Sequence, residues 1–188
     1  MGFEVATLEI RDATEADLPA IVGIYNATVP SRMVTADPDP VPVESRREWL
    51  RGHDPNRHPL WVAGADGEVA GWFSFEPFRE RPAYRATAEV SVYVAEGHRR
   101  KGIGRRLLEE AIRRAPGFGF KILTAGAFGH NGPSLELFEG FGFERWAFYP
   151  GVAELDSIER DLVVLGLKLD EEEHERSWGR SPTREPTG

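Results

Sequence analysis

The clearest chemistry in the sequence comes from a cluster of basic residues and glycines at positions 98–106, which reads HRRKGIGRR. It directly precedes a run typical of an amphipathic helix, with apolar residues at Leu107, Leu108, Ala111 and Ile112. The first turn of a helix exposes unpaired backbone N–H groups and carries partial positive charge, and both favour a bound anion. Glycines let an anion approach the backbone, and arginines supply donors for phosphate oxygens. The spacing therefore predicts a phosphate or pyrophosphate site; the alternative is a solvated basic turn at the start of a helix.

A second candidate is Glu89, the one acidic residue in the otherwise apolar run at 88–94. Burial raises the pKa of a carboxyl group, which suits a general base. The alternative is an edge residue that faces solvent or pairs with an arginine. Arg79 and Arg81 lie two residues apart in a loop at 77–84, so their side chains point the same way if the segment is extended. Without further context, plain solvation of these two arginines is the alternative.

Two motifs give the cluster a context. Arg99-x-x-Gly102-x-Gly104, after a β-branched strand, resembles the coenzyme A pyrophosphate loop of the GNAT superfamily of N-acetyltransferases. The segment 131–143, NGPSLELFEGFGF, resembles the second signature of that superfamily, a helix that opens on Asn and ends in Gly-Phe. Several shorter segments look like the phosphinothricin N-acetyltransferase branch: Tyr25-Asn26, Trp61-Val62-Ala63, Asp66-Gly67, residues 77–84 and residues 89–94. The resemblance covers about residues 8–169.

The resemblance implies acetyl-CoA as co-substrate. In this superfamily the strand at 89–94 splays from its neighbour, so its free backbone groups pair with the pantetheine amides, and an N–H there polarises the thioester carbonyl. Asn131 would bind the pantetheine arm, or act as a helix N-cap. The expected donor-binding residues are Val92, Tyr93, Val94, Arg99, Arg100, Lys101, Gly102, Ile103, Gly104, Arg105, Asn131 and Ser134.

For the acceptor, the resemblance implies a small amino acid-like molecule whose primary amine attacks the thioester directly, with Glu89 as the base. The expected substrate-binding residues are Arg79, Arg81, Tyr84 and Ser91. The arginines would suit a carboxylate or phosphinate. Two other functions stay open: a protein or peptide N-acetyltransferase, and a catalytically silent coenzyme A-binding sensor. The resemblance also implies a homodimer.

Three departures from the branch pattern touch the expected site. Phe138 stands where relatives place a tyrosine or histidine that protonates the leaving thiolate. Water, Tyr149 or Tyr93 would supply the proton, or the thiolate leaves unassisted, since a thiol's pKa is only about 8.5. The segments 31–37 and 155–161 also differ from the branch, and the second retains only its aspartate. The natural acceptor therefore stays open.

Composition bounds the remaining possibilities. The 188 residues include 31 acidic and 23 basic ones, so the formal net charge is −8, which argues against nucleic acid as a partner. There is no cysteine, which excludes disulfides and thiol chemistry, and His53 and His58 lack a third ligand for a metal. No apolar run approaches the ~20 residues of a membrane span. We expect a cytoplasmic protein with no membrane partner and no metal.

The elements that must position these residues follow from periodicity. Strands are predicted at 8–11, 60–65, 68–75, 88–94, 121–127, 144–149 and 158–169, and helices at 14–28, 43–51, 102–114 and 133–141. Hairpins mixed with crossovers favour a mixed α/β sheet. The resemblance implies an acetyltransferase fold: a central, mostly antiparallel, splayed sheet of about seven strands flanked by about four helices. We expect one domain at 1–169 and a disordered acidic, proline-bearing tail at 170–188, or else a short helix docked through Trp178.

Overall fold

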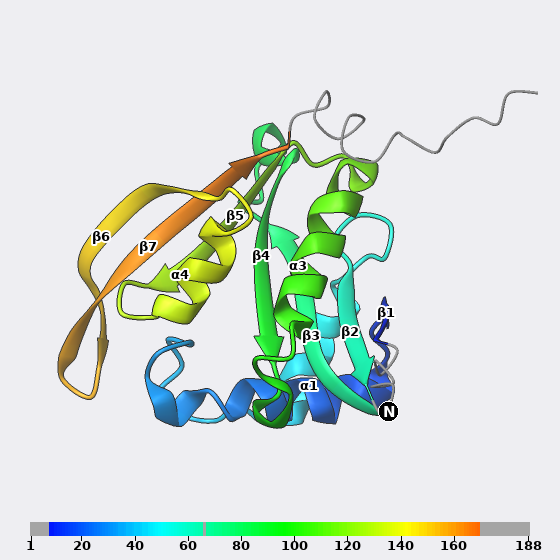
Figure 1. The fold of residues 1–188 in the computed structure, drawn as a ribbon, viewed down its shortest axis with the longest axis horizontal. Helices are drawn as coiled ribbons and strands as arrows, with labels where there is room; N and C mark the ends of the chain where they lie inside the picture. Colours follow the sequence, from blue (N-terminus) through cyan, green and yellow to red (C-terminus); the bar gives the residue numbers. More distant parts are fainter. Residues whose placement is uncertain (1–7, 66, 170–188) are drawn as a thin grey trace, which may run out of the picture.

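A seven-stranded sheet in the order β1-β2-β3-β4-β5-β7-β6 forms the centre of the computed structural model (Figure 1), which describes residues 8–65 and 67–169. All neighbouring strands run antiparallel except β4 and β5, so the prediction of a mixed, mostly antiparallel sheet is confirmed. The strands are β1 (Glu9–Asp12), β2 (Leu60–Ala65), β3 (Glu68–Pro77), β4 (Thr87–Val94), β5 (Ile122–Phe128), β6 (Glu144–Leu155) and β7 (Ile158–Lys168). The predicted tail at 170–188 lies outside the described residues, so the division at residue 169 stays a prediction.

Four α-helices of the described residues cover the two faces of the sheet: α1 (Leu18–Asn26), α2 (Arg47–Arg51), α3 (Ile103–Arg114) and α4 (Gly132–Glu139). Alternate side chains of β2 show which helices cover each face of the sheet. Trp61 packs in the cluster that holds Leu107 of α3 and Phe138 of α4, whereas Val62 packs with Ile21 of α1. Successive side chains of a strand point to opposite faces, so α1 and α2 lie on one face and α3 and α4 on the other. None of these helices is both long and apolar enough to cross a membrane.

The sheet opens between β4 and β5. Their parallel pairing is limited to three registered positions, the last of which joins Glu89 to Thr124. Beyond that point β4 continues along β3 and β5 continues along β7, and the two strands diverge (Figure 1). The predicted splay is therefore present, and it begins at Glu89.

The β6–β7 hairpin is longer than its sequence indicates. The strand predicted at 144–149 continues to Leu155 because the ladder absorbs the Pro150-Gly151 break through a register shift between Tyr149 and Ala153. Gly151 has φ +58, which explains the glycine. The segment 155–161, which departs from the branch pattern, forms the hairpin turn at Asp156 and Ser157 and the start of β7.

The first helix is tied to β1 by a buried carboxylate. Asp17 accepts hydrogen bonds from both Nη atoms of Arg11, at 2.8 and 2.7 Å, and from the backbone N–H of Thr14 at 2.8 Å. The arginine above all, and then the Thr14 donors, outweigh burial and lower the pKa of Asp17 from 3.8 to about 2. This carboxylate fixes the start of α1, whose Tyr25 reaches the site described below.

We expect Asp17→Asn to lower the free energy of unfolding at pH 7 by about 2 kcal/mol, the equivalent of that pKa shift. A depressed pKa in the folded state stabilises the protein above the unfolded-state pKa, and this stabilisation is lost as pH falls through the folded-state value. Urea titrations should therefore show the full difference at pH 7 and almost none near pH 2. Asp12→Asn, at an exposed position on β1, is the control. A difference that is independent of pH would contradict the assignment.

Candidate active site

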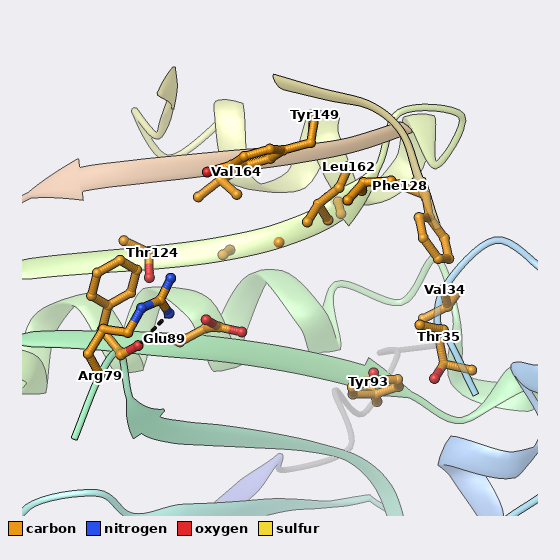
Figure 2. A pocket seen from close by; sticks show the side chains of 16 residues that line it. Val34, Thr35, Arg79, Glu89, Tyr93, Thr124, Phe128, Tyr149, Leu162 and Val164 are labelled. Atoms are coloured by element: carbon orange, nitrogen blue, oxygen red, sulfur yellow. Dashed lines mark hydrogen bonds between the residues drawn. The ribbon is translucent and has the colours of Figure 1, made fainter. Parts of the chain in front are cut away.

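A cavity of about 500 Å³ lies where the sheet opens, on the face that carries α1. Its walls come from β4 (Glu89, Tyr93), from the loop after β3 (Arg79) and from the loop at residues 34–36. Its floor is the face of β5, β7 and β6 that points away from α4, with Thr124, Phe128, Leu162, Val164 and Tyr149 (Figure 2). The floor is thus mainly apolar, and charge enters from the β3–β4 side.

Glu89 stands at the last paired position before the splay and turns its side chain into this cavity (Figure 2). Burial by the cavity walls raises the pKa of its carboxyl group, and the carboxylate of Glu76 raises it further, while Arg79 lowers it in part. The carboxyl is reachable from the cavity and partly desolvated by its walls. Glu89 is exposed to the cavity, and its pKa is shifted in the direction that favours proton uptake.

The predicted acceptor residues divide between separate places. Arg79 lines the cavity beside Glu89; its guanidinium lies 4.5 Å from the centre of the Phe78 ring and donates to the Phe78 carbonyl at 2.8 Å. Ser91 lines a smaller neighbouring cavity of about 120 Å³ between β3, β4, α1 and α2. Arg81 and Tyr84 line neither cavity, although the Tyr84 ring packs edge-on against Phe78. The structure therefore brings Arg79 and Glu89 together and leaves Arg81 outside.

The backbone of β4 has a free edge at the splay. The N–H of Ala95 donates to Ala70 on the β3 side, whereas the carbonyl of Ala88 accepts from the Thr124 hydroxyl on the β5 side. Because backbone groups of successive strand residues point to opposite sides, Val92 and Val94 direct their N–H and C=O groups toward the opening. Tyr93 directs its backbone groups to β3, and its contribution is its side chain.

The glycine-containing loop ends at the N-terminus of α3, as predicted. Arg100 and Gly102 have φ values of +60 and +80, and this turn brings Ile103, Gly104 and Arg105 into the first helical turn, where N–H groups lack helical partners. A Cβ on Gly104 would lie 3.4 Å from Val94 and 3.6 Å from Leu137 of α4. A side chain at position 104 would therefore contact both β4 and α4.

Among the basic side chains of this loop, two contact neighbouring groups. Arg99 contacts the Val94 carbonyl through Nε at 3.4 Å, and the guanidinium of Arg105 lies 4.9 Å from the centre of the Phe141 ring. Arg100 and Lys101 are exposed. Positive charge therefore surrounds the start of α3, beside the opening.

The second motif begins as a helix cap. Asn131 is buried, and its side-chain oxygen accepts from the N–H of Ser134 at 3.2 Å, which is the N-cap role weighed above. Phe138 is buried in the core against Phe143, with ring centres 5.1 Å apart. Two phenols line the cavity instead: Tyr93, whose pKa burial raises, and Tyr149, which is about half exposed.

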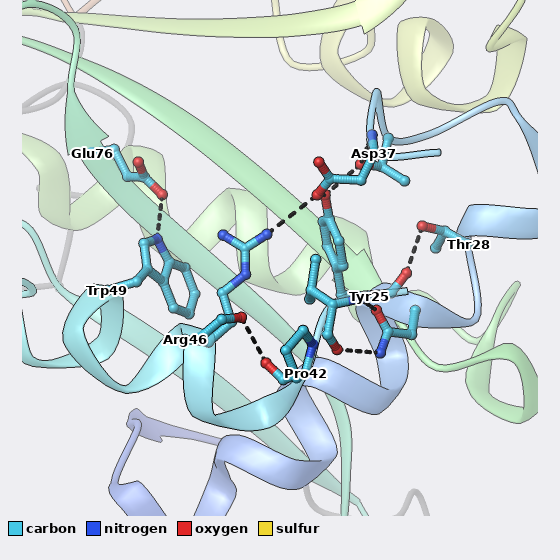
Figure 3. A network of polar contacts seen from close by, with 11 residues as sticks. Tyr25, Thr28, Asp37, Pro42, Arg46, Trp49 and Glu76 are labelled. Carbon is cyan, nitrogen blue, oxygen red and sulfur yellow. Dashed lines mark hydrogen bonds and ion pairs between the residues drawn. The ribbon is translucent and has the colours of Figure 1, made fainter. Parts of the chain in front are cut away.

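A strap formed by residues 32–42 borders the cavity through Val34, Thr35 and Ala36. On one side Tyr25 of α1 bonds to Thr35 and Asp37, as Figure 3 shows in part. On the other side Arg32 forms an ion pair with Asp156 at the hairpin tip, with Nε to Oδ2 at 2.7 Å. The sequence indicated a loop here and gave no sign of these contacts, since Arg32 and Asp156 are 124 residues apart.

A mixed sheet that opens beside a glycine-bearing helix N-terminus is the fold that the family resemblance implied, and solved acetyltransferase structures share it. The chain belongs to the acetyltransferase (GNAT) family, whose model matches residues 21–143. It is therefore an acetyl-CoA-dependent N-acetyltransferase by class.

Named relatives confirm the resemblance to the phosphinothricin branch. The chain is 53% identical over 163 residues to "Putative phosphinothricin acetyltransferase YwnH" of Bacillus subtilis (strain 168), covering 86% of this chain and 99% of that protein. It is 36% identical over 162 residues to an L-methionine sulfoximine/L-methionine sulfone acetyltransferase of Pseudomonas paraeruginosa, covering 86% and 94%. A phosphinothricin acetyltransferase from Sinorhizobium meliloti, solved in complex with AcCoA, superposes with a TM-score of 0.82 at 30% identity, covering 88% of this chain and 90% of that one.

Proposed function

We propose that this enzyme transfers the acetyl group of acetyl-CoA to the primary amine of a small, anionic, amino acid-like molecule. The observation that carries the proposal is one cavity that places Arg79 beside Glu89 at the point where β4 leaves β5. Relatives named for methionine sulfoximine, methionine sulfone and phosphinothricin support this class of acceptor.

The chain's own residues account for each requirement of the reaction. The α3 N-terminus and Arg99–Arg105 hold the pyrophosphate, and the free edge of β4 at Val92 and Val94 pairs with the pantetheine amides. One of these N–H groups stabilises the oxyanion that forms when the amine attacks the thioester carbon. Glu89 accepts the proton that the amine loses, and the C–S bond then breaks. Tyr93 or Tyr149, both of which line the cavity, protonates the leaving thiolate, in place of Phe138.

We place the enzyme in the cytoplasm as a homodimer. Exposed aromatic side chains along β6 support self-association: Trp146 and Phe148 are 42% and 60% exposed.

Donor binding is tested at Gly104. We expect acetyl-CoA to raise the melting temperature of the wild type. Gly104→Val should abolish that rise, because the side chain fills the space between Val94 and Leu137. Gly23→Val on α1 is the control, since a Cβ there meets nothing within 4 Å. An undiminished ligand-induced shift in Gly104→Val would contradict this donor site.

The base is tested at Glu89. Glu89→Gln should lower kcat by roughly 10²–10⁴-fold, since the amide cannot accept the proton. KM for acetyl-CoA should be unchanged. Glu80→Gln removes the same charge at an exposed position nearby and should retain wild-type rates. Full activity of Glu89→Gln across roughly pH 6–9 would exclude Glu89 as the base.

The acceptor is tested with a panel of amino acids and their sulfone, sulfoximine and phosphinate analogues, in an assay of thiol release. At least one should be acetylated. Arg79→Ala should weaken its binding by about 1.5–3 kcal/mol, the usual value of a hydrogen bond to a charged group. The loss should appear in KM for the amine and not in KM for the donor. Arg81→Ala should lose less, because Arg81 lies outside the cavity. No turnover of the panel, together with acetylation of a peptide N-terminus, would favour a protein-modifying enzyme instead.

A further inference from the structure

Glu76 faces Glu89 across the sheet. The two residues are registered partners in the antiparallel β3–β4 ladder, which puts both side chains on the same face. Directly opposite residues have Cβ atoms about 4.5–5.5 Å apart, and like charges in such a pair are unfavourable. Two acidic residues are therefore direct neighbours where the sheet opens, and only one of them, Glu89, has been given a role.

The position of Glu76 is fixed from α2. The indole Nε1 of Trp49 donates to Oε1 of Glu76 at 2.9 Å (Figure 3). The Trp49 ring is itself held edge-on against Trp72, with ring centres 5.7 Å apart. An indole N–H is a neutral donor, so it orients the carboxylate without cancelling its charge.

The charged groups around the pair compensate its negative charge only in part, through Arg79. Among the described residues, no arginine or lysine forms an ion pair with Glu76 or Glu89. The Arg79 guanidinium is turned onto Phe78, and Arg46, which shares the smaller cavity with Glu76, is paired with Asp37 at 3.4 Å. The other titratable groups near Glu76 are Tyr93 and two histidines, His53 and His58, whose pKa values burial lowers.

We propose that Glu76 is a positioning residue for acetyl transfer: held by Trp49, it places a second negative charge beside Glu89, so that Glu89 takes up a proton more readily than an isolated carboxylate. The inference rests on the proposed role of Glu89 as base. A carboxylate with greater proton affinity removes a proton from an amine more effectively. The same two charges attract the ammonium form of the acceptor, which brings the amine to the base.

The effect of Glu76 is measured first without any reaction. In protein labelled with ¹³C at the glutamate side-chain carboxyls, Glu89 is assigned by comparison with Glu89→Gln and titrated by NMR. We expect Glu76→Gln to lower the midpoint of Glu89 by about 1 pH unit, the lower end of the range for a charge at this distance. Glu76→Asp keeps the charge, so the Glu89 midpoint should stay close to its wild-type value. Glu80→Gln, which removes an exposed charge outside both cavities, should leave it unchanged. A wild-type midpoint in folded Glu76→Gln overturns the proposal.

The second measurement is the pH profile of kcat/KM for the amine. In Glu76→Gln the acidic limb of this profile should shift to lower pH by as much as the Glu89 midpoint does in the NMR titration. A merely structural role would instead lower kcat/KM equally at every pH. A midpoint that falls without a matching move of the limb overturns Glu89 as base and, with it, the role of Glu76 in the reaction. Absence of turnover by the wild type would count against the proposed function, while the NMR titration would still decide whether the two carboxylates interact.

Discussion

The parting of β4 from β5 after three registered positions is the constraint on which the site depends. Each strand keeps a complete ladder on its other side, β4 with β3 and β5 with β7, so the opening costs pairing only along the two inner edges. Backbone N–H and C=O groups require partners, and along these inner edges the sheet does not supply them. The same divergence admits the start of α3 beside the opening and aims Glu89 and Tyr93 into the cavity. The donor site, the base and the acceptor cavity are three consequences of one interrupted ladder.

The two arms of the splayed sheet carry different chemistry. The arm formed by β3 and β4 provides the charged groups, Glu76, Arg79 and Glu89, near the point of opening. The arm formed by β5, β7 and β6 provides an apolar floor with the phenol of Tyr149. An acceptor that fills the cavity therefore meets charge on one side and apolar surface on the other. Such a division suits an amino acid-like molecule, whose charged head and side chain differ in polarity.

Local signals in the sequence were enough to predict the strands, the helices and the loop before α3, whereas the splay of the sheet was predicted from the family resemblance. Glu89 and Gly104 could be predicted as candidate site residues because an acidic residue in an apolar strand and glycines before a helix are recognisable from the local sequence alone. The signals failed where a residue acts through a distant one. Glu76 gains its place from the β3–β4 register and from Trp49, and the ion pair of Arg32 with Asp156 joins residues 124 positions apart. The extension of β6 was missed because Pro150-Gly151 normally ends a strand, whereas the long ladder with β7 outweighs that local preference.

The strap at residues 32–42 turns the splayed sheet into a closed frame. The two arms join at the hinge between β4 and β5, and again at the mouth, where Arg32 bonds to Asp156 and its carbonyl contacts His130 at 2.9 Å. A frame joined at both ends cannot widen unless one of these contacts breaks, so residues 34–36 form a fixed border of the acceptor cavity. The ion pair between Arg32 and Asp156 is a weak contact, because the Asp156 carboxylate is exposed and salt screens its attraction to Arg32. Salt therefore acts on the joint between residues 32–42 and the β6–β7 hairpin, at a contact that touches neither Glu89 nor the loop before α3.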